Sequence, residues 1–197
     1  LAVEYRVTDP GIRLTVAEAA GGDAPMDADS TGRVLCLLGC APNGVQAMSF
    51  DIPGLVQTSL NLGILETGEG AVTASFCLRS ALDSQKEMLK DRLACLAGRL
   101  GGGTAFSGDY PGWAYRPDSP LRERMVAVFR DQYGREPKVE AIHAGVECGL
   151  FAGKLPGLDA VSIGPDLTDI HTPRERMHVA SVQRVWRFLL EVLRRSR

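Results

Sequence analysis

Two of the three histidines in this 197-residue chain stand in contexts that hold an imidazole ring firmly. His143 lies in the stretch Ile142–Gly149, where a short apolar run ends in a Gly-rich turn. A second apolar run, Val161–Pro165, leads to His171, just before a predicted helix start. Imidazole rings are frequent metal ligands. A hydrolytic metal site needs about three or more protein ligands. The rest of the sequence does not obviously supply them, so it predicts only part of a metal site.

His171 is the strongest candidate for a metal ligand. The residues Thr172–Glu175 have the form of a capping box, with Thr172 as the cap and Pro173 as the first helical residue. Such a helix start fixes the backbone of His171 and directs its ring. The alternative is a histidine in a turn that is hydrogen-bonded to a carbonyl group, and the spacing alone leaves both open.

A second group of candidates surrounds the Gly-rich turn. His143 and Glu147 flank Gly145, and this glycine and Gly149 permit close approach of the backbone to a ligand. The start of the following helix offers free N–H groups to a carboxylate. The alternative is an ordinary strand-to-helix turn that carries a polar pair.

Two polar residues on predicted strands complete the candidate set. Arg79 stands at the end of a strand, and its guanidinium group suits bidentate recognition of a carboxylate. Asn61 interrupts an apolar run, so we expect it either to face water or to take part in a site. The alternatives are plain surface positions, with Arg79 paired to Asp83.

Composition excludes several classes of function. The net charge is −2 and charges of both signs are mixed along the chain. The chain therefore has no excess of basic residues of the kind that would indicate nucleic-acid binding. Five cysteines without a CxxC pair, and no secretory leader, favour the reducing cytosol. No apolar run reaches the roughly 18 residues of a membrane span, and the sequence has no HExxH, GxSxG or P-loop motif. We therefore expect a cytoplasmic protein whose partners are neither nucleic acid nor membrane.

The beginning of the chain predicts little regular structure. Residues 1–17 predict two short strands around a turn. Because the chain begins inside the first of them, we expect an amino-terminal portion to be missing. Residues 20–32 predict a polar loop, and residues 33–41 are either a short helix or a strand.

The next segment predicts a hairpin followed by a helix. Residues 56–65 and 71–80 have strand composition and are joined by a Gly-rich turn, which indicates an antiparallel pair. A helix is expected from Ser84, where Ser84–Glu87 form a capping box and leucines recur at helical spacing. Gly101–Gly103 end it.

Residues 107–119, rich in proline, glycine and aromatic side chains, are the best candidate for a domain boundary. Beyond them the pattern changes to α/β, with strands expected near 139–143 and 160–163.

Three helices are expected in this second part. The first begins at Pro120 with Ser119 as its cap, the second covers about 147–151, and the third begins near Ala180. The apolar face expected on the third helix consists of Val182, Val185, Trp186, Leu189 and Leu193.

These motifs together resemble the C-terminal part of the aminoacyl-histidine dipeptidases (Xaa-His dipeptidases, peptidase D), which belong to the M20 zinc metallopeptidases. The most specific match is Ile142–Phe151, with the string His-Ala-Gly-x-Glu-Cys-Gly, and Val161–Pro165 and His171–Glu175 support it. The resemblance covers essentially the whole chain. The more generic upstream matches are Pro42–Val45, Thr58–Gly63, Cys77–Ser80 and Tyr110–Trp113.

The resemblance implies the α/β fold class, with an α+β lid portion followed by the C-terminal part of a zinc-peptidase-like α/β catalytic domain. In this family the inserted lid domain splits the catalytic domain in sequence. Residues 1–112 then correspond to the later part of the lid domain. Residues 113–197 correspond to the C-terminal segment of the metallopeptidase catalytic domain.

The resemblance also implies roles for individual residues. His171 matches a histidine that ligates zinc in the family, and Arg79 matches the lid arginine that is thought to bind the substrate carboxylate. The resemblance also implies that the substrate pocket is lined by His143, Gly145, Glu147 and Asn61.

Other parts of the family pattern are absent from the sequence. They are the His-x-Asp motif, the bridging Asp, the adjacent Glu pair that includes the general base, a further metal carboxylate and the lid histidine. One histidine cannot hold a catalytic zinc ion. The resemblance therefore implies a parent protein that binds two zinc ions and hydrolyses Xaa-His and other dipeptides. This chain contains no catalytic residue, and without its partner, the amino-terminal half of the catalytic domain, we expect it to retain neither zinc nor activity.

Two alternatives stay open at this stage. One is a different M20 hydrolase, such as a tripeptidase or an aminoacylase, although the His-Ala-Gly-x-Glu-Cys-Gly string favours the dipeptidases. The other is a non-catalytic module that uses its lid for self-association, as a homo-oligomer or with another partner.

Overall fold

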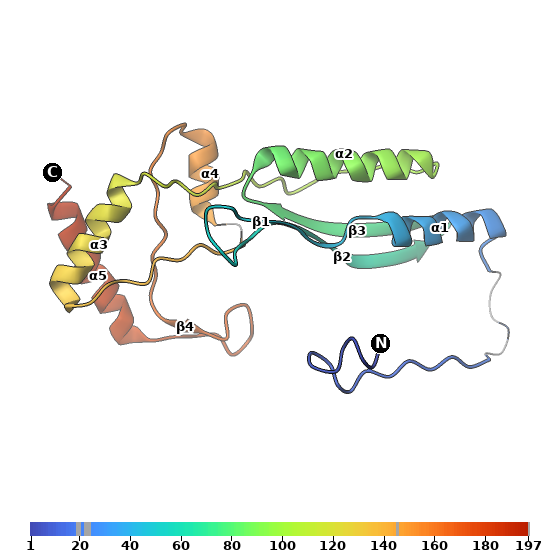
Figure 1. Ribbon diagram of the computed structural model, residues 1–197, viewed down its shortest axis with the longest axis horizontal. Helices are drawn as coiled ribbons and strands as arrows, with labels where there is room; N and C mark the ends of the chain where they lie inside the picture. The colour runs from blue at the N-terminus through green and yellow to red at the C-terminus, as the bar shows by residue number, and fades with distance from the viewer. Residues whose placement is uncertain (19–20, 22–24, 145, 197) are drawn as a thin grey trace.

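The computed structural model describes residues 1–18, 21, 25–144 and 146–196. It forms an elongated molecule with two groups of elements at opposite ends (Figure 1). One end holds α1, β1, β2, β3 and α2, and the other holds α3, α4, β4, β5 and α5. Helices and antiparallel sheets together make this an α+β arrangement. Among the described residues, no helix is long and apolar enough to span a bilayer.

The larger sheet has three antiparallel strands in the order β1-β2-β3. These strands are β1 (Gly44–Met48), β2 (Val56–Gly68) and β3 (Ala71–Ser80). Opposite partners include Ser59 with Arg79 and Asn61 with Cys77. The predicted hairpin is confirmed, and β2 runs further toward the turn than expected because it pairs with β3 as far as Gly68.

Two helices accompany this sheet. Helix α1 (Ala28–Cys40) resolves the open prediction for residues 33–41 as a helix, and it begins within the segment expected to be a polar loop. Helix α2 (Asp83–Arg99) ends before Gly101, as predicted. The capping box predicted at Ser84 is wrong, because the helix begins one residue earlier with Leu82 as its cap.

The second group of elements contains three helices. Helix α3 (Pro120–Tyr133) begins as predicted, with the Ser119 hydroxyl accepting a hydrogen bond from the backbone N–H of Arg122 at 3.1 Å. Helix α4 (Glu147–Lys154) and helix α5 (Val179–Arg194) also confirm predicted helices. The core here lies between α3 and α5 and consists of Met125, Val128, Phe188 and Val192.

Three predicted strand regions are wrong. Residues 139–143 and 160–163 pair with no strand in the described part of the chain, and a strand is stable only when its backbone groups pair with a neighbouring strand. Residues 2–11 form turns held by local hydrogen bonds, such as Tyr5 N–H to the Leu1 carbonyl at 2.9 Å, and residues 12–17 form no regular element. This amino-terminal segment stands clear of the sheet in Figure 1, so no ladder is within its reach.

The chain exposes far more surface than a compact protein. Its accessible surface is 14897 Å², whereas a folded monomer of 21.2 kDa exposes about 9,000 Å². Much of this surface is apolar, and it includes one side of α5. There Val179, Val182, Trp186, Leu190 and Leu193 are all exposed.

The face by which α5 packs differs from the predicted one and provides a test. Phe188 is 8% exposed and Trp186 is 60% exposed, although Trp186 belongs to the predicted apolar face. We expect Phe188→Ala to lower the free energy of unfolding by about 3 kcal/mol through loss of burial and a residual cavity. The matched change Trp186→Ala should cost no more than about 0.5 kcal/mol. Urea unfolding measures both, and equal losses would contradict the observed orientation of the helix.

Candidate substrate site on the open face of the sheet

The two faces of the three-stranded sheet differ in their side chains. Thr58 and Leu60 are fully buried, and the Thr58 hydroxyl donates a hydrogen bond to Gln85 of α2, so α2 covers this face. Because side chains alternate along a strand, Ser59 and Asn61 point to the opposite face. Arg79 pairs with Ser59 in the register and shares that face. The open face therefore presents a hydroxyl, an amide and a guanidinium group.

His143 reaches this open face from the other end of the molecule. Its Nε2 atom lies 2.6 Å from the Ser59 Oγ atom, although the two residues are 84 positions apart in the chain. Burial lowers the pKa of His143, and the nearby positive charge of Arg79 lowers it further, against a smaller raising effect of the Val56 carbonyl. At neutral pH the imidazole is therefore uncharged.

We use the name carboxylate cluster for Ser59, Arg79 and His143, because these three side chains together match a bound carboxylate. Arg79 supplies a permanent positive charge and a fork of N–H donors, which match the two oxygens of a carboxylate. The neutral imidazole and the hydroxyl can each donate or accept a hydrogen bond. Such a group of side chains can hold an anionic end of a small polar molecule.

The other predicted pocket residues are less engaged. Asn61 is exposed on β2, on the same face as Ser59 and one pleat further along the strand. Glu147 is the first residue of α4 and is exposed. Gly145 lies outside the described residues.

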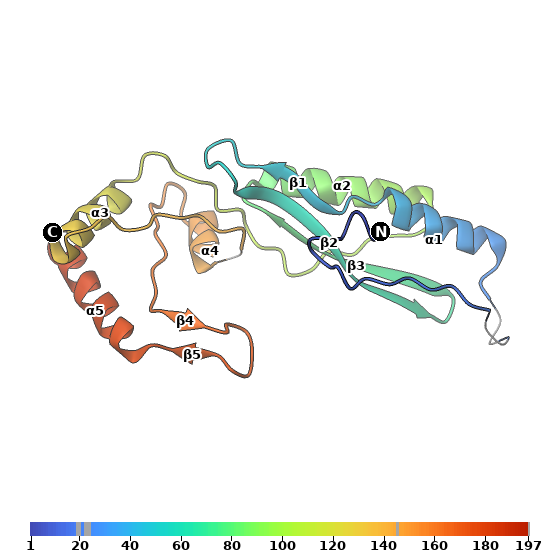
Figure 2. The ribbon, with the colours of Figure 1, turned by 60° about the horizontal axis from the view of Figure 1, so that its bottom comes forward.

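His171 stands in a setting different from the predicted one. The expected helix at Thr172 is absent, and residues 169–175 instead connect β4 (Leu167–Thr168) to β5 (Arg176–Met177). His171 is exposed with a φ of 65°, and its backbone N–H donates to the Glu175 carboxylate at 3.1 Å. Glu175 thus reaches back as in a capping box, but it closes a turn and not a helix. Figure 2 shows this hairpin standing clear of α4.

The fit of a metal ion can be judged from the donor side chains. Within the described ranges, no three His, Cys, Asp or Glu side chains gather closely enough to hold a metal ion. The residues that the structure describes therefore do not form a complete metal site by themselves, and His171 can offer at most one ligand to a site completed by other residues.

Ser59 was missed by reasoning from the sequence. A signal was present, because Ser59 lies two residues before Asn61 and must share its face in a strand. The contact with His143 could not be foreseen, since it depends on how the two ends of the molecule are joined.

The charge of Arg79 provides a test of the cluster. We expect Arg79→Gln to raise the pKa of His143 toward its ordinary value of 6.5, because the positive charge that helps to lower it is removed while the burial remains. NMR titration of the ring protons measures this, with Arg174→Gln as the control. Because the pKa of His143 is lower in the folded protein than in the unfolded chain, this residue contributes stability above pH 6.5. That contribution is lost as the pH falls through the pKa of His143 in the folded protein. An unchanged pKa of His143 in Arg79→Gln would show that the charge of Arg79 does not act on the imidazole.

Comparisons with known proteins agree with the motifs. No family model matches the sequence. The chain is 34% identical over 191 residues to the cytosol non-specific dipeptidase of Escherichia coli, a match that covers 97% of this chain and 39% of that protein. The chain therefore spans about two fifths of the length of this curated relative.

Solved structures give the same result. The aminoacylhistidine dipeptidase of Vibrio alginolyticus matches with a TM-score of 0.87 and 33% identity, over 98% of this chain and 39% of that one. The aminopeptidase PepT of Bacillus cereus shares the fold, with a TM-score of 0.59 and 17% identity over 82% of this chain and 44% of that one. The resemblance predicted from the motifs is confirmed: over nearly its whole length, this chain is similar in sequence and fold to a portion of the aminoacylhistidine dipeptidases.

Proposed function

We propose that this chain is the substrate-carboxylate-binding part of a zinc-dependent dipeptidase that hydrolyses Xaa-His and other dipeptides. The observation that carries the proposal is the carboxylate cluster, in which His143 contacts Ser59 near the charge of Arg79 on one face of the sheet, in a chain 34% identical to a dipeptidase. That relative is a cytosol dipeptidase, which supports a cytosolic location for this chain.

The cluster suits a very short peptide. The guanidinium of Arg79 binds the C-terminal carboxylate of the substrate, and the neutral ring of His143 hydrogen-bonds to a neighbouring polar group. Asn61 and Glu147 line the same pocket in this proposal, together with Gly145. A longer peptide has no free carboxylate at this distance from its scissile bond, so the arrangement favours dipeptides.

The metal chemistry of the proposed enzyme needs residues outside this chain. His171 is the one imidazole that we assign to a zinc ion, and the other ligands and the general base come from the amino-terminal half of the catalytic domain. In this proposal, residues 1–112 are the later part of the lid domain and residues 113–197 are the C-terminal segment of the catalytic domain.

The role of Arg79 can be tested in an enzyme that contains both halves. We expect Arg79→Ala to lower kcat/KM for dipeptides by about 10- to 100-fold, because it removes charge-assisted hydrogen bonds worth ~1.5–3 kcal/mol. The matched comparison uses the same dipeptides with an amidated C-terminus, for which the loss should be much smaller. An equal loss for both substrates would contradict carboxylate recognition.

The division of the metal site is tested by complementation. The zinc content and Xaa-His hydrolysis are measured for this chain alone and mixed with the amino-terminal half of a related dipeptidase. We expect neither zinc nor turnover in the chain alone, activity in the mixture, and loss of that activity in His171→Ala. Stoichiometric zinc and turnover in the chain alone would show that another set of residues forms the site.

The large exposed surface favours a second candidate, a non-catalytic module that self-associates. The same samples decide between the two. A mixture that stays inactive, together with sedimentation that shows a defined oligomer of the chain without metal, would favour the module.

A further inference from the structure

One charged side chain is buried where the helical pattern calls for an apolar one. Helix α2 packs Leu89, which is fully buried, toward the sheet, and one turn earlier the same stripe contains Lys86. Lys86 is only 8% exposed. A buried ammonium group is costly unless charged partners and hydrogen bonds surround it. The position of Lys86 therefore needs an explanation beyond the stability of the helix.

The partners of Lys86 lie mostly outside its own helix. Its Nζ atom lies 2.8 Å from Asp109 Oδ1, 2.8 Å from the Tyr110 carbonyl oxygen and 3.1 Å from Asp83 Oδ1. Three acceptors match the three N–H donors of an ammonium group. Burial alone disfavours the charged form, but the hydrogen bonds to Asp109 and Asp83 outweigh it and hold the pKa of Lys86 above its usual value.

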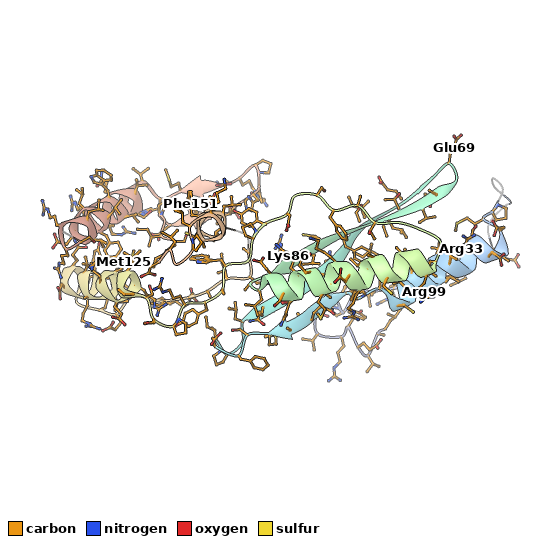
Figure 3. All side chains as sticks on the ribbon, turned by 90° about the horizontal axis from the view of Figure 1, so that it is seen from above. Arg33, Glu69, Lys86, Arg99, Met125 and Phe151 are labelled. Carbon is orange, nitrogen blue, oxygen red and sulfur yellow. The ribbon has the colours of Figure 1, made fainter. Side chains whose placement is uncertain are left out.

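Asp109 and Tyr110 belong to the segment that crosses between the two ends of the molecule. Figure 3 shows Lys86 on α2 near the narrow middle of the molecule, where this segment passes. Asp83 makes a second contact between α2 and this segment, because its Oδ1 atom accepts a hydrogen bond from the Gly112 N–H at 2.8 Å. The beginning of α2 thus holds residues 109–112 through one ammonium group and one carboxylate.

The crossing segment in turn carries α4. A Cβ atom on Gly149 would lie 3.2 Å from the Pro111 carbonyl oxygen, and one on Gly153 would lie 3.0 Å from Pro111 Cβ. These two glycines are one helical turn apart, so α4 rests directly on Pro111. His143 stands four residues before α4, and its ring meets Ser59 at 2.6 Å.

We propose that Lys86 is a positioning residue: by fixing residues 109–112 against α2, it places α4 so that the His143 ring contacts Ser59 on the face that carries Arg79. This assignment deepens the proposed function, on which its relevance to substrate binding rests. The positioning is a statement about the folded chain, so it can be tested without activity.

The His143 ring is the natural reporter. We expect Lys86→Met to return the pKa of His143 toward 6.5 in the folded protein, because the ring leaves the half-buried place beside Arg79. Lys86→Arg keeps the charge and should restore most of the wild-type value. NMR titration of the ring protons measures the shift, and the signals of the exposed His171 and His178 are expected not to change between variants.

The matched control is Lys90→Met. Lys90 lies one turn further along α2, and its Nζ atom contacts Glu87 at 2.9 Å and Asp109 only at 3.9 Å. It should leave the pKa of His143 unchanged. A lysine that only stabilises the fold would lower the urea midpoint in Lys86→Met and leave the His143 titration of the folded protein intact, and that result would overturn the proposal.

A milder variant keeps the test decisive if Lys86→Met does not fold. Asp109→Asn retains an oxygen for the ammonium group but removes the charge, and we expect a smaller shift of the His143 pKa in the same direction. No shift in Asp109→Asn would overturn the proposal in that case. These results are independent of hydrolysis: failure of carboxylate recognition by Arg79 would leave the response of His143 to Lys86 unchanged.

Discussion

The two ends of this molecule are joined through close backbone contact at Pro111 and Gly112. A Cβ atom on Gly112 would lie 2.5 Å from the Ala81 carbonyl oxygen, a distance that no side chain tolerates. On the other side of the segment, Gly149 and Gly153 let α4 approach Pro111, where added Cβ atoms would lie 3.2 and 3.0 Å from its atoms. Small residues on both sides therefore bring α2 and α4 to one strip of chain. The carboxylate cluster depends on this contact, because its members come from both ends.

Environment sets the charge of each basic group near this contact. Lys86 is buried among carboxylates, which keep it charged, and it also lowers the pKa of Asp109. His143 is half-buried beside a cation, and burial and Arg79 together keep it neutral. Arg79 is then the positive charge of the cluster, and the imidazole beside it is free to act as a neutral hydrogen-bonding group. An anion bound at the cluster therefore contacts one positive charge, that of Arg79, and not a second charge on His143.

The elements that the sequence predicts well are those whose signals are local. The hairpin of β2 and β3 needs only two adjacent strands and a Gly-rich turn, and α3 begins at Ser119 and Pro120 because a cap and a first-turn proline act within a few residues. The resemblance to dipeptidases is equally local, since it depends on short motifs.

The predictions that failed depended on distant partners. Residues 139–143 and 160–163 have strand composition, but no described strand lies beside them to pair with. The capping box at Ser84 failed because α2 begins at Asp83, whose carboxylate binds the Gly112 N–H and Lys86. Lys86 and Ser59 were missed because their importance lies in contacts 24 and 84 residues away.

The elements that lack a pairing or packing partner lie in the same part of the chain. Among the described residues, the strand-like runs without a partner strand, the exposed apolar side of α5 and His171, the proposed metal ligand, all lie in the part that begins at α3. The sheet end differs, because its strands pair and α2 covers one face. A strand needs a paired neighbour, an apolar helix face needs a cover and a metal ion needs several ligands. In the proposed dipeptidase, the amino-terminal half of the catalytic domain would cover the apolar side of α5 and would supply the remaining metal ligands.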